Sequence, residues 1–337
     1  MIPEAKQPAV RRALHKVFGV NEPEELRLLT GGLSSALAFR IVVIKNPYLL
    51  KILRTEVISD PANEFACQQA AAEAGIAPRI LYASVEDRIV ITDYVEAKPF
   101  PEDMALRMAA TIRRLHSLPG FPSPKMGNYF DAMNNGFVRR FQAAQLLPKS
   151  ATEELFHRYG EVLRVYPRNY RDQVASHNDL KPQNMRFDGE RIRLVDWESA
   201  FLNDRYVDLA VVANFFVEDE AQEEHYLDAY FGEPAGERSE YRRARFFLMR
   251  QALSMFYAAL LFLEAARAGL SIDANMSTPD FREYHEELIS DTVDMLTAEA
   301  KAQYGMIHLR EALRNMRTPR FEEAVALVGK LHWTESE

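Results

Sequence analysis

The chain has 337 residues, with 41 Lys and Arg against 49 Asp and Glu, so its formal net charge is −8. Hydrophobic residues make up 47% and charged residues 27%, which is typical of a globular protein and excludes a disordered or collagen-like chain. The negative balance disfavours a general nucleic-acid binder, which usually carries a surplus of basic residues. The length allows one large domain or two smaller ones.

Cysteine content and hydropathy favour an intracellular protein. Cys67 is the only cysteine, so no disulfide can form within the chain, as is usual in a reducing compartment. The first residues lack the apolar core of a signal peptide. The most apolar stretch, 252–263, is shorter than the roughly 20 residues that span a bilayer. We therefore expect a cytoplasmic protein without a membrane span, in which 252–263 is a buried helix.

The N-terminal part of the chain predicts a small antiparallel sheet. Apolar residues at helical spacing predict a helix over 4–18, and an alanine-rich segment predicts a second helix over 61–74 that ends at Gly75. Turn signals at Gly31-Gly32 and Asn46-Pro47 separate short runs of β-branched and large apolar residues. These runs predict strands over 26–30, 36–44, 48–53, 80–83 and 88–94.

The texture changes at 95–101, where two prolines mark a linker. Beyond it almost every segment has helical period, except 174–216, where strands over 184–187 and 192–195 flank a hairpin turn at Asp188-Gly189. The sequence thus predicts two lobes, 1–96 and 97–337. Helices of the second lobe are predicted over 103–117, 136–160, 221–231, 238–267, 279–302 and 307–331.

The segment that follows Ser176 carries side chains suited to phosphoryl transfer. Asn184 stands five positions after Asp179, in a loop that contains Pro182. Asp196 ends the second strand of the hairpin, which folds it back towards this loop. Phosphoryl transfer needs one carboxylate to accept the proton of the attacking hydroxyl, and a second carboxylate with an amide oxygen to hold magnesium.

This pattern resembles the kinase signature H-R-D-x-x-x-x-N followed by an Asp at the end of a strand. Three segments carry a closer likeness, namely His177-Asn178-Asp179, Asp196-Trp197-Glu198 and Asn203-Asp204-Arg205-Tyr206-Val207-Asp208-Leu209-Ala210. On these residues the chain resembles the aminoglycoside phosphotransferase and choline kinase family, most closely its bacterial choline kinase-like branch. The resemblance implies a bilobal, protein-kinase-like α+β fold with a small antiparallel N-lobe and a large, mostly helical C-lobe. It also implies ATP and Mg²⁺ as cofactors.

The resemblance implies roles for the residues of this segment. Asp179 would be the catalytic base, and Asn184 and Asp196 would bind Mg²⁺. Lys181 would contact the transferred phosphate or be a solvated loop lysine. His177 would brace the loop.

Two further acidic residues would support the same site. Asp208 would anchor the catalytic loop through backbone hydrogen bonds. Glu198 would assist the metal site or hold structure, and the sequence does not separate these two roles.

The N-lobe would hold the nucleotide. Lys51 on the third strand resembles the lysine that contacts the phosphates, and Glu64 on the next helix would pair with it. Arg54 is the competitor, but strand alternation places it on the other face from Lys51. Small residues of the first turn would approach the phosphates, and main-chain groups at the end of the fifth strand and just after it would bind the adenine. These residues are Gly31, Gly32, Ser34 and Ser35 for the phosphates, and Asp93 and Val95 for the adenine.

The acceptor pocket is predicted from residues that resemble the choline pocket of the family. That pocket combines acidic groups with aromatic rings, which attract a quaternary ammonium through cation–π interactions. Its counterparts would be Glu198, Glu218, Phe215 and Tyr257, although Leu260 stands where the family has a second tryptophan. Core packing and a solvated helix start are the alternative interpretations of these residues.

The leading hypothesis is therefore an ATP- and Mg²⁺-dependent kinase of a small alcohol that carries an amine, such as choline or ethanolamine. Aminoglycosides, thiamine and amino alcohols are alternative acceptors. A catalytically silent nucleotide-binding protein is the alternative from another class. A protein kinase is disfavoured because no Ala-Pro-Glu segment follows Asp196. The sequence does not indicate an oligomeric state.

Overall fold

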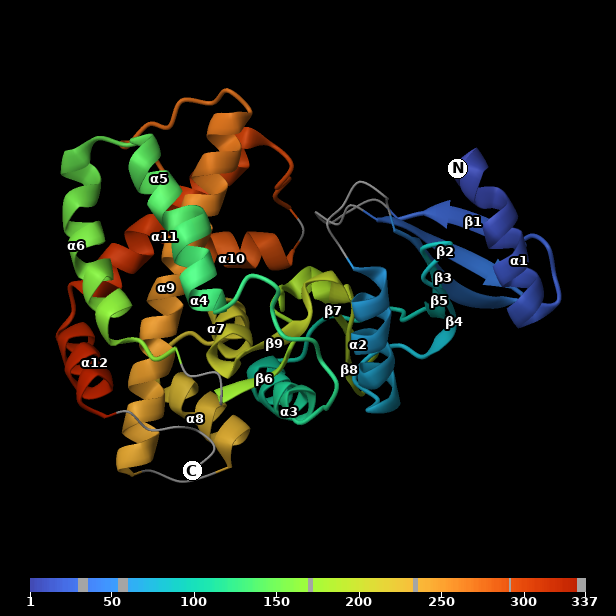
Figure 1. The fold of residues 1–337 in the computed structure, drawn as a ribbon, viewed down its shortest axis with the longest axis horizontal. Helices are drawn as coiled ribbons and strands as arrows, with labels where there is room; N and C mark the ends of the chain where they lie inside the picture. The colour runs from blue at the N-terminus through green and yellow to red at the C-terminus, as the bar shows by residue number, and fades with distance from the viewer. Residues whose placement is uncertain (30–35, 54–59, 169–171, 233–235, 291, 332–337) are drawn as a thin grey trace. The chain divides into compact units, whose positions relative to one another are not determined.

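The structure is a computed structural model that describes residues 1–29, 36–53, 60–168, 172–232, 236–290 and 292–331 (Figure 1). The chain divides into two compact units. The boundary predicted near residue 96 stays a prediction. Unit 1 comprises Met1–Glu102, Arg114–Pro122 and Ala175–Phe201, and unit 2 comprises Asp103–Arg113, Ser123–Val174 and Leu202–Glu337.

A five-stranded antiparallel sheet forms the first part of unit 1, in the order β1-β2-β3-β5-β4. The predicted strands are confirmed to within a few residues. The β2–β3 turn, however, lies at Ile44 and Lys45, which both have positive φ, and Pro47 is already part of the strand. The strands are β1 (Glu25–Leu28), β2 (Leu37–Val43), β3 (Asn46–Ile52), β4 (Ile80–Ser84) and β5 (Ile89–Asp93).

The two faces of this sheet have different partners. A short 3-10 turn, η1 (Glu4–Lys6), leads into α1 (Gln7–Phe18), which packs Val10 and Leu14 against strand residues such as Leu50. Leu53 and Val90 instead pack with Phe65 of α2 (Pro61–Glu73). Alternation along β3 therefore separates Lys51 from its neighbours Leu50 and Ile52, which belong to the cluster with α1.

The hairpin segment within Ala175–Phe201 also belongs to unit 1, and two hydrogen bonds tie it to the loop after α2. The amide of Leu194 donates to the carbonyl of Ile76 (2.7 Å), and the Arg193 guanidinium donates to the carbonyl of Gly75 (2.7 Å). These bonds fix the hairpin against the element that carries Glu64. The short elements of this region are β6 (Gln173–Ser176), η4 (Pro182–Asn184), β7 (Met185–Phe187), β8 (Ile192–Leu194), η5 (Trp197–Ser199) and β9 (Phe201–Asp204).

Unit 2 is built around the long helix α9 (Glu237–Arg267), which packs mainly against α11, α12 and α7. A Cβ on Gly305 of α11 would lie 3.2 Å from the Phe262 ring of α9, so glycine permits this close approach. The other helices are α3 (Met104–His116), which crosses the division between the units, α4 (Tyr129–Met133), the π-helix η2 (Asn134–Val138), α5 (Arg139–Ala144), α6 (Lys149–Val165), α7 (Arg205–Phe216), α8 (Glu220–Phe231), α10 (Phe281–Ile289), α11 (Ala298–Met316) and α12 (Pro319–Lys330).

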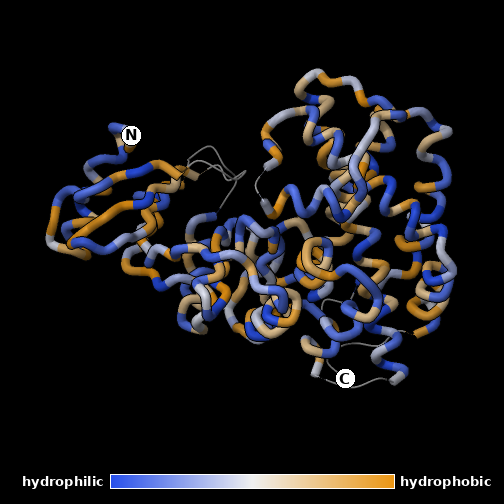
Figure 2. The backbone as a smooth tube through the Cα atoms, turned by 180° about the vertical axis from the view of Figure 1, so that it is seen from behind, coloured by the Kyte–Doolittle hydropathy of each residue, from blue (hydrophilic) through white to orange (hydrophobic). Residues whose placement is uncertain are grey.

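The buried helix expected at 252–263 lies within α9. In the described part of the chain this is the one helix long and apolar enough to cross a membrane, and 72% of its most apolar window is buried. Apolar and polar residues mix along most other segments of the backbone, as amphipathic elements require (Figure 2).

Three helix predictions differ from the structure. The segment 136–160 is not one helix, because Gln145 has φ +48° and Pro148 precedes α6. Thr318-Pro319 likewise separates α11 from α12, since proline starts a helix more readily than it continues one. The predicted helix 279–302 also breaks, because α10 ends at Ile289 and α11 begins at Ala298.

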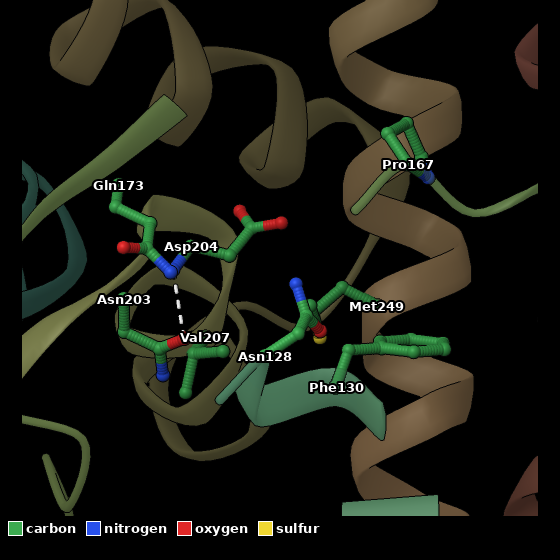
Figure 3. A pocket seen from close by; sticks show the side chains of 8 residues that line it. All are labelled: Asn128, Phe130, Pro167, Gln173, Asn203, Asp204, Val207 and Met249. Atoms are coloured by element: carbon green, nitrogen blue, oxygen red, sulfur yellow. Dashed lines mark hydrogen bonds between the residues drawn. The ribbon is translucent and has the colours of Figure 1, made fainter. Parts of the chain in front are cut away.

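A buried ionic network lies at the N-terminal end of α7. Arg245 of α9 donates to Asp172 (2.8 Å) and to Asp204 (2.9 Å), and the Tyr166 hydroxyl also donates to Asp204 (3.0 Å). A small cavity of about 10 Å³ adjoins Asp204, large enough for one water molecule. In Figure 3 the amide of Asp204 donates to the side chain of Asn203, which also lines the cavity (2.8 Å).

Candidate active site

The loop after β6 gathers the first group of predicted catalytic side chains. Lys181 Nζ lies 2.7 Å from Asp179 Oδ2, and Asn184 Nδ2 donates to the same oxygen (2.8 Å) and to the Asp179 carbonyl (2.8 Å). These contacts orient the carboxylate and use one of its two oxygens. The other oxygen is the atom that could accept a proton from a hydroxyl.

Lys51 lies between two carboxylates of unit 1. Its Nζ is 2.8 Å from Glu64 Oε1 and 2.6 Å from Asp196 Oδ1, and its side chain is only 11% exposed. Burial lowers the pKa of Lys51, but the charges of Asp196 and Glu64 outweigh it, so the pKa lies above its ordinary value. Burial likewise raises the pKa of Asp196, but Lys51 outweighs it and holds the pKa below its ordinary range. Lys51 and Asp196 are therefore both ionised at neutral pH.

The Asp196 backbone is in the left-handed region, with φ +68° and ψ +71°. For a residue other than glycine this conformation costs about 1–3 kcal/mol, and such strain is common at functional sites. The pKa of Glu198 is raised by partial burial and then by the charge of Asp196, with smaller effects from Glu64 and Asp179. Glu198 therefore belongs to the same acidic group.

The donor set fits magnesium. Mg²⁺ prefers hard oxygen ligands and usually takes one or two carboxylates, with phosphates and waters completing its shell. The amide of Val195 donates to the Asn184 carbonyl (2.9 Å), so Asp196 follows a residue bonded to the second predicted ligand. Within the residues described, no group of three or more His, Cys, Asp or Glu side chains forms a metal site by itself. A metal held by Asp196 and Asn184 would need further oxygens, such as those of a nucleotide.

His177 is fully buried and braces this region. Its Nε2 donates to the Val195 carbonyl (3.0 Å), and its ring lies 4.8 Å from the ring of Trp197. These contacts are those of a structural histidine, the role that the sequence assigns to it.

The residues predicted to bind ATP are described only in part. Gly31, Gly32, Ser34 and Ser35, and the competing Arg54, lie outside the described residues. Asp93 and Val95 line a groove of about 500 Å³ on unit 1, and the Asp93 carboxylate is paired with Arg79 (3.2 Å). The adenine contacts of their main chains stay a prediction.

Phe215 and Tyr257, two of the predicted acceptor residues, belong to one aromatic cluster of unit 2. The Phe215 ring lies 4.7 Å from His285, which lies 5.9 Å from His308. The Tyr257 ring stacks on His308 at 5.1 Å with an interplanar angle of 29°. One face of Tyr257 is therefore covered by another ring, as in core packing.

Glu218 and Asp208 are also part of unit 2. Glu218 is exposed next to the first turn of α8, where its amide donates to Gln222 (2.9 Å). Its charge acts on Arg282, whose side chain donates to the Val217 carbonyl. Asp208 is fully buried in α7. Its predicted anchoring of the catalytic loop stays a prediction.

Comparison with known families agrees with this geometry. Residues 25–247 match the model of the phosphotransferase enzyme family, well over half of the chain. The chain belongs to the phosphotransferase enzyme family. The match spans Lys51, Glu64, Asp179, Asn184 and Asp196, and it confirms the resemblance inferred from the sequence. No curated protein matches the sequence.

Solved structures show the fold of this phosphotransferase. A choline/ethanolamine kinase family protein from Mesorhizobium loti covers 97% of this chain and 100% of its own, with 21% identity and a TM-score of 0.66. A choline kinase from Streptococcus pneumoniae has 14% identity and a TM-score of 0.55 over 86% of this chain and 98% of its own. A spectinomycin phosphotransferase, in complex with ADP and spectinomycin, has 11% identity and a TM-score of 0.56 over 88% and 97%. The predicted protein-kinase-like fold is confirmed.

Sequence reasoning gave no role to one polar residue of this phosphotransferase site. Asn178 is buried, with φ +66°, and its amide donates to the carbonyl of Ser199 (2.8 Å). Asparagine directly before the predicted base was the available signal, because asparagine adopts the left-handed region more readily than most residues.

Proposed function

We propose that this phosphotransferase transfers the γ-phosphoryl group of ATP, bound with Mg²⁺, to the hydroxyl of a small alcohol. The observation that carries the proposal is the grouping within unit 1 of an oriented carboxylate, Asp179, with the pair Lys51–Asp196 and the amide of Asn184. Each of these groups has a counterpart in phosphoryl transfer by kinases.

Each residue of the site has its own role in the proposed phosphoryl transfer. The alcohol oxygen forms a bond to the γ-phosphorus while the bond to the bridging oxygen of ADP breaks, and Asp179 accepts the hydroxyl proton. Asn184 and Asp196 would hold Mg²⁺, which would neutralise charge on the phosphates. Lys51 would supply one cation from the N-lobe, and Lys181, which pairs with Asp179, would supply a second.

For the acceptor we propose an alcohol that carries an amine, with choline and ethanolamine first. The support is the likeness to a choline/ethanolamine kinase family protein along nearly the whole of both chains. His308 covers one face of Tyr257 and Arg282 neighbours Glu218, so a choline cage at these residues has less support than the reaction. Aminoglycosides, thiamine and amino alcohols are therefore the alternatives.

A panel of alcohols with ATP and Mg²⁺, followed by release of ADP, tests the function. Choline, ethanolamine, thiamine, homoserine and kanamycin separate the acceptor classes. We expect ADP release with at least one of them above the rate with ATP alone. Binding of ATP without release in the presence of any acceptor would favour a silent nucleotide-binding protein.

Asp179→Asn tests the proposed base. Removing a general base lowers the rate by about 10²–10⁴-fold, so we expect kcat to fall by this factor with the active alcohol. The affinity for Mg-ATP should change by less than about threefold, because Asp179 is not a proposed metal ligand. Asp103→Asn, which alters an exposed carboxylate beside Arg107, is the matched control. Near-normal turnover of Asp179→Asn would show that another group accepts the proton.

A further inference from the structure

Two consecutive residues of the catalytic loop hold the segment that carries Asp196. His177 donates to the carbonyl of Val195, directly before Asp196 (3.0 Å). The side-chain amide of Asn178 donates to the carbonyl of Ser199, directly after Glu198 (2.8 Å). The three residues Asp196-Trp197-Glu198 are thus held from both ends by neighbours of the proposed base.

The conformations of Asn178 and Asp196 explain why such support is useful. Both residues have left-handed backbones, with φ of +66° and +68°, so each contact compensates for local strain. Asn178 is 8% exposed and also donates to the Ser176 carbonyl (3.4 Å). A glycine would adopt the same backbone without strain, but it would offer no amide to Ser199. The asparagine therefore supplies a specific hydrogen bond in addition to a permitted conformation.

The hydrogen bond from Asn178 to Ser199 bears on the positions of the two proposed metal ligands, Asn184 and Asp196. Asp179 follows Asn178 directly, and Asn184 is bonded to Asp179 and to the amide of Val195. The Asn178–Ser199 hydrogen bond adds a further restraint to this region, on the C-terminal side of Asp196. Its loss would free the C-terminal end of the 3-10 turn η5 while leaving Lys51, Glu64 and the sheet in place.

We propose that Asn178 is a positioning residue, whose amide holds Asp196 at the spacing from Asn184 that Mg²⁺ binding requires. This inference rests on the proposed function, because it concerns the proposed metal ligands. It predicts that Asn178 influences the magnesium dependence of nucleotide binding and not the binding of the nucleotide itself.

The experiment measures the affinity of the full chain for a non-hydrolysable ATP analogue, once with Mg²⁺ and once with EDTA. The ratio of the two dissociation constants gives the gain in affinity from Mg²⁺. Asn178→Gly keeps the backbone conformation and removes the amide. Asn178→Asp keeps the shape and replaces the donor by an acceptor that faces the Ser199 carbonyl. Asn46→Ala, which removes an amide-to-carbonyl bond in the β2–β3 turn (2.9 Å), is the matched control.

We expect the gain from Mg²⁺ to fall roughly threefold to tenfold in Asn178→Gly, the effect of one buried hydrogen bond, and further in Asn178→Asp. The affinity of both variants for the analogue in EDTA should equal that of the unaltered protein. The control Asn46→Ala should have the same affinities as the unaltered protein under both conditions. An unchanged gain from Mg²⁺ in both variants, or an equal loss with and without Mg²⁺, overturns the positioning role. No gain from Mg²⁺ in the unaltered protein would instead overturn the proposed function, so the two failures are distinguishable.

Discussion

At the scale of single residues, Lys51 shows how one cation organises two acidic groups. It contacts Glu64 of α2 and Asp196, directly before η5, at hydrogen-bonding distance, and Glu64 is only 3% exposed. A lysine held by two carboxylates has a fixed position between them. If Asp196 binds Mg²⁺ as proposed, Glu64 would limit how strongly Lys51 competes with the metal for Asp196.

Glu64→Gln should therefore weaken the response to magnesium. Without the charge of Glu64, Lys51 pairs more strongly with Asp196, which is then less available to Mg²⁺. We expect the Mg²⁺ concentration for half-maximal nucleotide binding to rise roughly tenfold, consistent with the loss of a charged hydrogen bond. Titration of Mg²⁺ at constant nucleotide measures it. Glu73→Gln, at the other end of α2, should behave as the unaltered protein, and a Mg²⁺ response unchanged by Glu64→Gln would contradict the proposed competition.

At the scale of elements, sequence patterns predicted the sheet better than the helices. Residues of β2, β3 and β5 alternate between two differently packed faces, so their period is visible in the sequence. Helix α7 was not predicted, because most of its residues are buried on all sides and its sequence lacks an amphipathic period. The positive φ at Gln145 has no signal in residue type, but Pro148 directly before α6 was a signal for the break that the prediction of one helix over 136–160 did not use.

The buried ionic network of Arg245 connects helix α9 to Asp204 at the start of α7. Arg245 and Asp172 are each 1% exposed, and Asp204, the second partner, also accepts from the amide of Tyr206 at the start of α7 (3.0 Å). Arg245→Ala would remove the cation that Asp172 and Asp204 share. Removing one partner of a buried ion pair costs about 3–5 kcal/mol, so we expect a loss of this size in the free energy of unfolding.

Urea unfolding of the variant measures this loss. Arg243→Ala on the same helix is the matched control, because Arg243 pairs with Glu224 (2.6 Å) through side chains that are 28% and 48% exposed. Such a pair contributes less than about 1 kcal/mol. Equal destabilisation by the two substitutions would contradict the special role of the buried network.

At the scale of the whole molecule, the sequence predicted that the proposed catalytic residues lie together, but it did not predict the packing around the proposed acceptor residues. The spacing of Asp179, Asn184 and Asp196 follows from a short hairpin, so a local pattern was enough to predict their grouping. Recognition of the acceptor depends on which aromatic residues are left uncovered by tertiary packing. The rings of Phe215 and Tyr257 contact histidines that are distant in sequence, and residue type alone does not reveal such contacts.

The lowered pKa values of these two buried histidines predict how the stability of the protein depends on pH. Burial lowers the pKa of His285 to about 3, aided by the charges of Arg282 and Arg250, and burial places the pKa of His308 well below its ordinary value. His285 accepts from the Tyr304 hydroxyl (3.0 Å) and donates to a backbone carbonyl, so it is held in its neutral form. In the unfolded chain both histidines titrate near 6.5.

Stability should therefore be complete above pH 6.5 and fall as the pH drops towards 3, because the unfolded chain then binds protons that the folded chain excludes. Each histidine contributes about 1.4 kcal/mol per pH unit, or about 2 kcal/mol by pH 5. Carboxylates with lowered pKa, such as Asp196, lose their contribution only near pH 4 and below. Urea unfolding at intervals between pH 7.5 and 5 measures the slope. His308→Gln should reduce the slope of the free energy of unfolding against pH by the contribution of one proton. His157→Gln, at an exposed position, should leave this slope unchanged. A free energy of unfolding that does not change over this pH range would contradict the burial of the two histidines in their neutral form.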